Sequence, residues 1–130
     1  MKKLFFAKII RLPILIAPHC LLMKKYKKHF SFYLKKINIS SSTNAIISNH
    51  NSNLLYSKKD IYNSLVKQIY KKVRWSDNIK KIISLRKKII IEIGIGRILT
   101  NLNKKNKTIQ SYSTDHSKKL SLIVDIIKKL

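Results

Sequence analysis

Short runs of β-branched residues alternate along this chain with segments whose apolar residues recur at helical spacing, and this alternation most limits its possible folds. Residues 89–91 are three consecutive isoleucines, and residues 45–47 form a second short apolar run. Residues 12–17 also read as a short buried strand, and residues 108–113 alternate weakly, as in a last strand. Strands that alternate with helices indicate an α/β fold in which parallel strands are covered by amphipathic helices.

Two helices are predicted in the first half of the chain. Residues 20–36 place apolar side chains on one face and lysines on the other. The second helix is expected to begin after Ser57, because Asp60 three residues later resembles the acidic partner of a capping box, and to run to about Tyr70. The polar residues 48–57 before it are expected to form an exposed loop. The apolar positions expected on the first helix are Leu22, Tyr26, Phe30, Tyr33 and Ile37.

Three further helices are predicted in the second half. Ser76 or Asp77 is expected to cap the first of these helices, whose apolar positions are Ile79, Ile82 and Ile83. The second covers about residues 97–104, after the strand at 89–91. The last is amphipathic and begins at Ser117.

The charge of the chain is far from balanced, with 29 basic residues against 5 acidic ones and a net charge of +24. Such a charge first suggests a polyanion partner, and a small basic nucleic-acid-binding protein of the ribosomal kind is therefore the alternative function. A structural or interaction module without catalysis is a third class. Lysine greatly outnumbers arginine and is spread along the whole chain, whereas specific readers of nucleic acid favour arginine. We interpret the charge as compositional drift that supports only non-specific polyanion binding.

The first residues resemble a signal peptide, because Lys2 and Lys3 precede an apolar stretch. Lys8 and Arg11 interrupt this stretch, and no small-x-small cleavage site follows. No apolar run approaches the roughly 18 residues that a membrane span needs. Cys20 is the only cysteine, so no intramolecular disulfide can form. We expect a cytoplasmic protein without membrane association.

Two polar residues are candidates for a site. His19 lies on a turn directly after the predicted strand 12–17, where α/β enzymes place catalytic groups, although a loop histidine without a role is the simpler interpretation. Gln68 lies beside the apolar stripe that Ile61, Leu65 and Ile69 form on its helix. A buried amide needs a partner, so Gln68 either orients another polar group or is satisfied by nearby backbone.

Other motifs carry less information. Gly94 and Gly96 lie between a strand and a helix but lack the third glycine of a dinucleotide fingerprint, so they indicate a tight turn. His29, His50 and His116 have no metal-ligand spacing. An acid/base pair of carboxylates is improbable among five acidic residues. Three of these acids read as a cap, a strand-end residue and a turn residue: Asp77, Glu92 and Asp115.

Two stretches together resemble the malonyl-CoA:acyl-carrier-protein transacylase family. The first is Leu-Pro at 12–13 with Pro-His-Cys-Leu-Leu-Met at 18–23. The second is Leu-Val-Lys-Gln-Ile-Tyr at 65–70, then Val-Arg-Trp at 73–75, then Glu-Ile-Gly-Ile-Gly-Arg-Ile-Leu-Thr at 92–100. Order and spacing also match the family, from about residue 12 to the end of the chain.

The resemblance implies a fold and an activity. Residues 1–130 would be one partial domain, the C-terminal part of an α/β-hydrolase-like acyltransferase domain with an incomplete sheet. The family transfers malonyl from coenzyme A to the phosphopantetheine thiol of acyl carrier protein in fatty-acid biosynthesis, with a serine nucleophile and a histidine base. His19 matches that histidine, and the backbone carbonyl at Gln68 matches the group that orients it. The coenzyme A thioester is a substrate, and no cofactor or metal is implied.

The chain also departs from the family. It contains no Gly-x-Ser-x-Gly, and the serine, the malonyl-binding arginine and the oxyanion-hole residues lie upstream in the family. Pro18 replaces a small polar residue, and Ile95 replaces the proline of Gly-Pro-Gly. We therefore expect a chain that is inactive alone. It would be either a gene remnant or one piece of a split enzyme whose separate N-terminal piece carries the serine.

Overall fold

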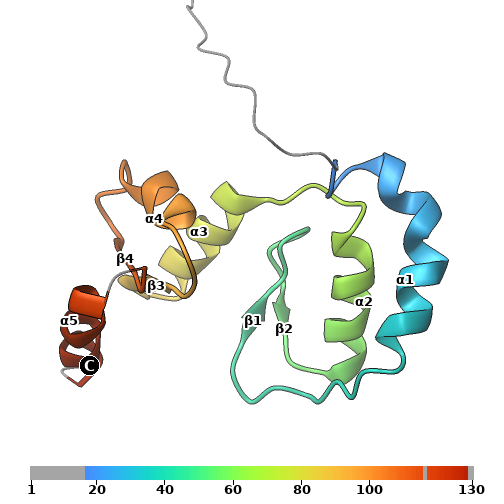
Figure 1. Ribbon diagram of the computed structural model, residues 1–130, viewed down its shortest axis with the longest axis horizontal. Helices are drawn as coiled ribbons and strands as arrows, with labels where there is room; N and C mark the ends of the chain where they lie inside the picture. Colours follow the sequence, from blue (N-terminus) through green and yellow to red (C-terminus); the bar gives the residue numbers. More distant parts are fainter. Residues whose placement is uncertain (1–16, 116, 129–130) are drawn as a thin grey trace, which may run out of the picture. The chain divides into compact units, whose positions relative to one another are not determined.

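The structure is a computed structural model that describes residues 17–115 and 117–128 (Figure 1). The chain divides into two compact units, an N-terminal unit that ends at Val73 and a C-terminal unit that begins at Arg74. The strand predicted over residues 12–17 lies outside the described residues, apart from Ala17.

The N-terminal unit begins with a helical segment of two kinds. A 3₁₀ helix, η1 (Leu21–Tyr26), leads into the α-helix α1 (Lys27–Leu34). Residues 20–36 were predicted as one regular helix. The start differs because no side chain caps η1 and its first turn contains no acidic residue, and uncapped helix ends often tighten into 3₁₀ geometry. The predicted apolar face is also largely wrong. Leu34 is buried, whereas Leu22, Tyr26, Tyr33 and Ile37 are exposed.

Helix α2 (Lys58–Gln68) confirms the predicted cap. The Ser57 Oγ accepts the backbone N–H of Asp60 at 3.1 Å and donates to the Asp60 carboxylate at 2.6 Å. The predicted stripe along Ile61, Leu65 and Ile69 is not the most buried face. Ser64 and Val66 are buried in their place, because α2 is flanked on two sides. The hydroxyl of Tyr62 reaches Ser31 of α1, and Ser64 meets a β-hairpin.

The hairpin consists of β1 (Ile46–Ile47) and β2 (Leu54–Leu55), which pair antiparallel with Ile46 opposite Leu55. The strand predicted at 45–47 is confirmed. The prediction of an exposed loop over 48–57 is wrong at β2, because two apolar residues within a polar stretch are too few to show a period. It is also wrong at Ser48 and Ser52, which are buried. The turn is closed by two hydrogen bonds, Ser48 N–H to Asn53 O and Ser52 N–H to Ser48 O.

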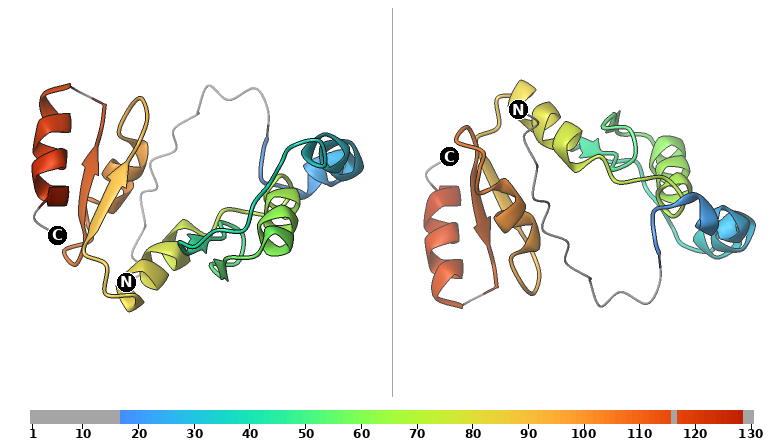
Figure 2. Two further views of the ribbon diagram at one scale, coloured as in Figure 1. Left: turned by 90° about the horizontal axis from the view of Figure 1, so that it is seen from below. Right: turned by 90° about the horizontal axis from the view of Figure 1, so that it is seen from above.

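The C-terminal unit alternates helices and strands. Its elements are α3 (Trp75–Ser84), β3 (Ile89–Glu92), α4 (Ile98–Asn103), β4 (Gln110–Ser113) and α5 (Ser117–Lys128). Strands β3 and β4 run parallel, with Ile89 opposite Gln110 and Glu92 opposite Ser113. Figure 2 shows α4 on one face of this strand pair and α5 on the other. The predicted α/β class with parallel strands is confirmed.

One cap in this unit was predicted wrongly. Ser76 and Asp77 lie inside the first turn of α3, and Arg74 occupies the N-cap position without a side-chain cap. The Asp77 carboxylate instead accepts from Arg74 Nε at 2.7 Å, so it acts on the first turn through an ion pair. Ile79 is buried as predicted, together with Ile109 and Ile123.

The sheets are incomplete, as predicted. Within residues 17–115 and 117–128, each of the two sheets has two strands. Ile93, Ile95 and Ile98, which follow β3, are largely exposed. Among the described helices, none combines the length and the apolar character that crossing a membrane requires.

Candidate functional site

The backbone at His19 is held in an unusual conformation. Its φ of 60° lies in the left-handed region, which histidine tolerates better than bulky or β-branched residues do. Its backbone N–H donates to Ile69 O at 3.1 Å, and its ring Nδ1 lies 2.7 Å from Gln68 O. Two successive carbonyls at the end of α2 thus hold both the backbone and the ring of one residue.

These carbonyls are available because α2 ends there. The last four carbonyls of a helix have no partner within it, and they concentrate the negative end of the helix dipole. A carbonyl can only accept a hydrogen bond, so Nδ1 must carry a proton, and the neutral tautomer that fits this contact has its lone pair on Nε2. In the neutral ring, Nε2 can therefore accept a hydrogen bond or a proton from another group.

A carboxylate does not orient this histidine within the described part of the N-terminal unit. The one acidic residue there, Asp60, lies in the first turn of α2, at the opposite end from Gln68, and bonds Ser57. The contact between His19 and Gln68 is the one that the resemblance implied. It uses the backbone carbonyl of Gln68, whereas the sequence pattern alone had pointed to the side-chain amide. The catalytic roles of both residues stay predictions.

Cys20 takes no part in this contact. Its Sγ donates to Ala17 O at 3.2 Å, and the residue is half-buried. The Cys20 thiol therefore bonds the backbone of the preceding turn.

A second polar cluster in the same unit was missed by sequence reasoning. Ser48 Oγ lies 2.7 Å from His50 Nδ1 and 2.8 Å from Ser64 Oγ. Burial lowers the pKa of His50, and the nearby charges of Lys67 and Lys71 lower it further. Only a serine at a helix interior position, Ser64, hinted at this cluster in the sequence.

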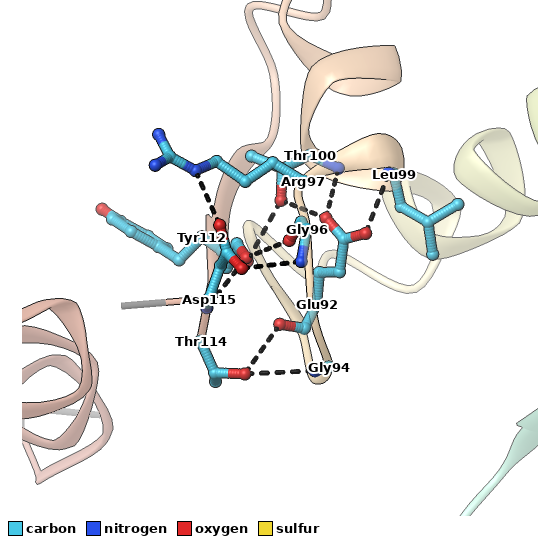
Figure 3. Close-up of polar contacts among 10 residues, drawn as sticks. Glu92, Gly94, Gly96, Arg97, Leu99, Thr100, Tyr112, Thr114 and Asp115 are labelled. Atoms are coloured by element: carbon cyan, nitrogen blue, oxygen red, sulfur yellow. Dashed lines mark hydrogen bonds and ion pairs between the residues drawn. The ribbon is translucent and has the colours of Figure 1, made fainter. Parts of the chain in front are cut away.

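Glu92 organises the turn of the C-terminal unit (Figure 3). Its carboxylate accepts the backbone N–H groups of Leu99 at 3.0 Å and Thr100 at 2.8 Å, and the Thr100 hydroxyl at 2.7 Å. Glu92 is the last residue of β3, as predicted, but its role as the cap of α4 was not foreseen. Because its carboxylate occupies these N–H groups, the turn is not arranged to bind a phosphate.

The two glycines and Asp115 complete this turn. Gly94 and Gly96 have φ values of 142° and 91°, which side-chain-bearing residues rarely adopt. The Asp115 carboxylate accepts from Gly96 N–H at 2.7 Å and from Arg97 Nε at 3.4 Å. The tight turn and the turn residue predicted here are confirmed. His116 lies outside the described residues, and no group of three metal-binding side chains occurs among those described.

We expect the hydrogen bonds of Glu92 to make the free energy of unfolding of the C-terminal unit depend on pH in the acidic range. The Thr100 hydroxyl, and then the N–H groups of α4, hold the pKa of Glu92 below its ordinary value. The stabilisation is therefore fully present above the ordinary glutamate pKa of about 4.3, and is lost as the pH falls through the lowered value. Unfolding measured against pH should show that Glu92→Gln removes this dependence, so that variant and parent converge in acid.

Asp125→Asn is the matched control, because Asp125 is an exposed carboxylate of α5 outside this network. Its pH dependence should stay close to that of the parent. An equal loss of stability at every pH in Glu92→Gln would show that the charge of Glu92 does not matter.

Comparison with known sequences identifies several relatives, although no protein-family profile matches the chain. The chain is 36% identical over 110 residues to the malonyl CoA-acyl carrier protein transacylase of Buchnera aphidicola subsp. Schizaphis graminum, covering 85% of this chain and 36% of the relative. It is 29% identical over 112 residues to the protein of that name from Bacillus subtilis, covering 85% of this chain and 35% of the relative. The chain thus spans about a third of the curated relatives it matches.

Solved structures of malonyl transacylases also superpose on this chain. A FabD crystal structure from Acinetobacter baumannii superposes with a TM-score of 0.83 at 27% identity, covering 91% of this chain and 38% of that one. A malonyl-transacylase solved in complex with a type II PKS acyl-carrier protein superposes with a TM-score of 0.81 at 25% identity, covering 88% and 37%.

Proposed function

This chain is homologous, over most of its length, to part of the malonyl CoA-acyl carrier protein transacylases, and we propose that it supplies the general base of a malonyl transfer from coenzyme A to acyl carrier protein. The observation that carries the proposal is the 2.7 Å contact between His19 Nδ1 and Gln68 O. The proposal includes a role in fatty-acid synthesis, a cytoplasmic location, and no cofactor besides the coenzyme A thioester that serves as substrate.

His19 would act in both halves of the transfer. Nε2 takes the proton of a serine hydroxyl while the serine oxygen attacks the malonyl thioester carbonyl, and the proton then passes to the departing coenzyme A sulfur. In the second half, Nε2 takes the proton of the acyl-carrier thiol, whose sulfur attacks the malonyl-serine ester, and returns it to the serine oxygen. The Gln68 carbonyl keeps the ring oriented through both steps, and the Ile69 carbonyl holds the backbone of His19.

The serine has to come from another polypeptide segment, because the sequence contains no Gly-x-Ser-x-Gly. Two features support a partner that carries the remaining transacylase fold. The chain covers 38% of a solved transacylase chain. Leu21 and Leu22, two and three residues after His19, are 69% and 75% exposed, and burying this apolar surface would stabilise a complex.

Reconstitution tests the proposal. The full chain is mixed with the N-terminal part of the Buchnera relative, which precedes the matched segment, and transfer of labelled malonyl from malonyl-CoA to acyl carrier protein is measured. The chain alone should give no transfer above background, and the mixture should give transfer. Turnover by the chain alone would contradict the inference that the nucleophile comes from another polypeptide segment. If the two pieces are folded and associated but the mixture is inactive, the split-enzyme interpretation is rejected and the gene-remnant interpretation remains.

A further inference from the structure

The cluster of Ser48, His50 and Ser64 joins the β1–β2 hairpin to the helix that holds His19. We infer that these three residues form a positioning network, which fixes the C-terminal turn of α2 and, through it, the Gln68 carbonyl. The inference deepens the proposed function, because a base with a misplaced carbonyl would lose its fixed proton on Nδ1. The network itself consists of positioning residues and touches no reacting atom.

The two serines of the cluster are buried where the β1–β2 hairpin contacts α2. Ser48 is 2% exposed and Ser64 is 6% exposed. The side chain of Ser48 joins the other two members, and Ser64 Oγ also lies 3.5 Å from His50 Nδ1. A serine inside a helix commonly bonds a carbonyl of its own helix. Ser64 instead bonds across to the hairpin, sixteen residues earlier in the chain.

The hairpin side of the cluster is rigid. Ser48 uses its backbone N–H to bond Asn53 O at 2.9 Å and its carbonyl to accept Ser52 N–H at 2.8 Å. Ser52 has a φ of 60°, which a loose turn would not retain. The Ser48 hydroxyl is therefore presented to α2 from a closed turn.

Ser64, the member of the cluster on α2, lies close to the carbonyl that His19 contacts. Ser64 and Gln68 are four residues apart on α2 and thus share one face, one turn from each other. The α2 helix ends at Gln68, so its final turn has no further helix to hold it. The contact at Ser64 therefore holds α2 against the hairpin one turn before the carbonyl that His19 uses.

The protons of the cluster fit a neutral His50. When its proton is on Nε2, Ser48 donates to Nδ1 and Ser64 donates to Ser48, so both hydroxyl protons are used. Burial, Lys67 and Lys71 lower the pKa of His50, and all three favour this neutral ring. A network in which both buried hydroxyls donate resists rearrangement, because any change leaves a buried hydroxyl without an acceptor.

The tautomer of His19 reports on this network without any need for activity. In the full chain labelled with ¹⁵N-histidine, the two ring nitrogens show whether the proton is on Nδ1 or Nε2. Ser64→Ala and Ser48→Ala should each shift the ratio of tautomers about fivefold toward Nε2–H, the size expected from loss of one ordinary hydrogen bond. The double variant should add little, because both serines act through one chain of contacts.

Asn63→Ala is the matched control, because Asn63 is the exposed neighbour of Ser64 on α2. Folding is checked by circular dichroism, and if a serine variant loses helix, His50→Gln at the half-exposed end of the cluster carries the test. An unchanged His19 tautomer in folded variants overturns the inference. A shifted tautomer with an inactive wild-type reconstitution leaves the network standing and rejects only the proposed function.

Discussion

Replacing His19 by asparagine is expected to lower malonyl transfer by the reconstituted enzyme about 10³-fold, within the range that a general base contributes. Asparagine suits the test because it tolerates the left-handed backbone at this position, where φ is 60°. Its amide can still donate a hydrogen bond toward Gln68 O, but it cannot accept a proton as Nε2 does. The variant therefore removes the base with little disturbance of the turn, and the measurement is kcat/KM for transfer to acyl carrier protein.

Two companion variants define what this loss means. His29→Asn changes an exposed histidine of α1 that contacts Tyr33, and should leave the rate unchanged. Gln68→Ala keeps the backbone carbonyl. It should therefore lower kcat/KM far less than removal of an orienting carboxylate does in enzymes where a carboxylate holds the catalytic histidine. If kcat/KM of the His19→Asn enzyme stays within about tenfold of the wild-type value, His19 is not the general base, because a general base typically contributes about 10²-fold or more to the rate.

Binding of unrelated RNA and DNA is expected to weaken by about 10³-fold when salt rises from about 50 to about 200 mM, the behaviour of a protein that contacts several phosphates. The reason is the net charge of +24, carried mainly by lysines distributed over both units. Dispersed lysines attract the backbone of any nucleic acid and read no base edges. Fluorescence anisotropy with several sequences, titrated with salt, gives the slopes.

Two sets of four substitutions test whether the charge is dispersed. Glutamine at Lys24, Lys25, Lys27 and Lys28 removes charge from the N-terminal unit, and glutamine at Lys104, Lys105, Lys107 and Lys128 removes it from the C-terminal unit. Both sets should reduce the salt slope equally. A preference for one sequence that persists at physiological salt would favour the ribosomal-type alternative.

Local signals in the sequence predicted much of the secondary structure. The Ser57 cap, the strand at 89–91 and the glycine turn at 94–96 were all confirmed, because each depends on residues within a few positions of one another. Strand β2 escaped prediction because two leucines carry no period. The buried face of α2 was assigned wrongly because the face depends on which elements flank the helix.

The candidate site divides in the same way. The resemblance singled out His19 and Gln68, and the structure joins them across 49 residues. The contact between Ser48 and Ser64 was not predicted, since sixteen residues separate them. The capping role of Glu92 was not predicted either, because it depends on how the glycine turn folds the chain back between Glu92 and Thr100.

By itself, the sequence determined the alternation of strands and helices, the Ser57 cap, the glycine turn, the charge, and the absence of a serine elbow from this chain. These properties follow from backbone preferences, side-chain period and composition, all of which act over short stretches. Only the tertiary structure decided that the end of α2 offers two unpaired carbonyls to His19, and that a hairpin serine meets Ser64 one turn earlier. Such contacts depend on hydrogen-bond geometry between segments that are distant in the chain, and residue spacing does not encode that geometry.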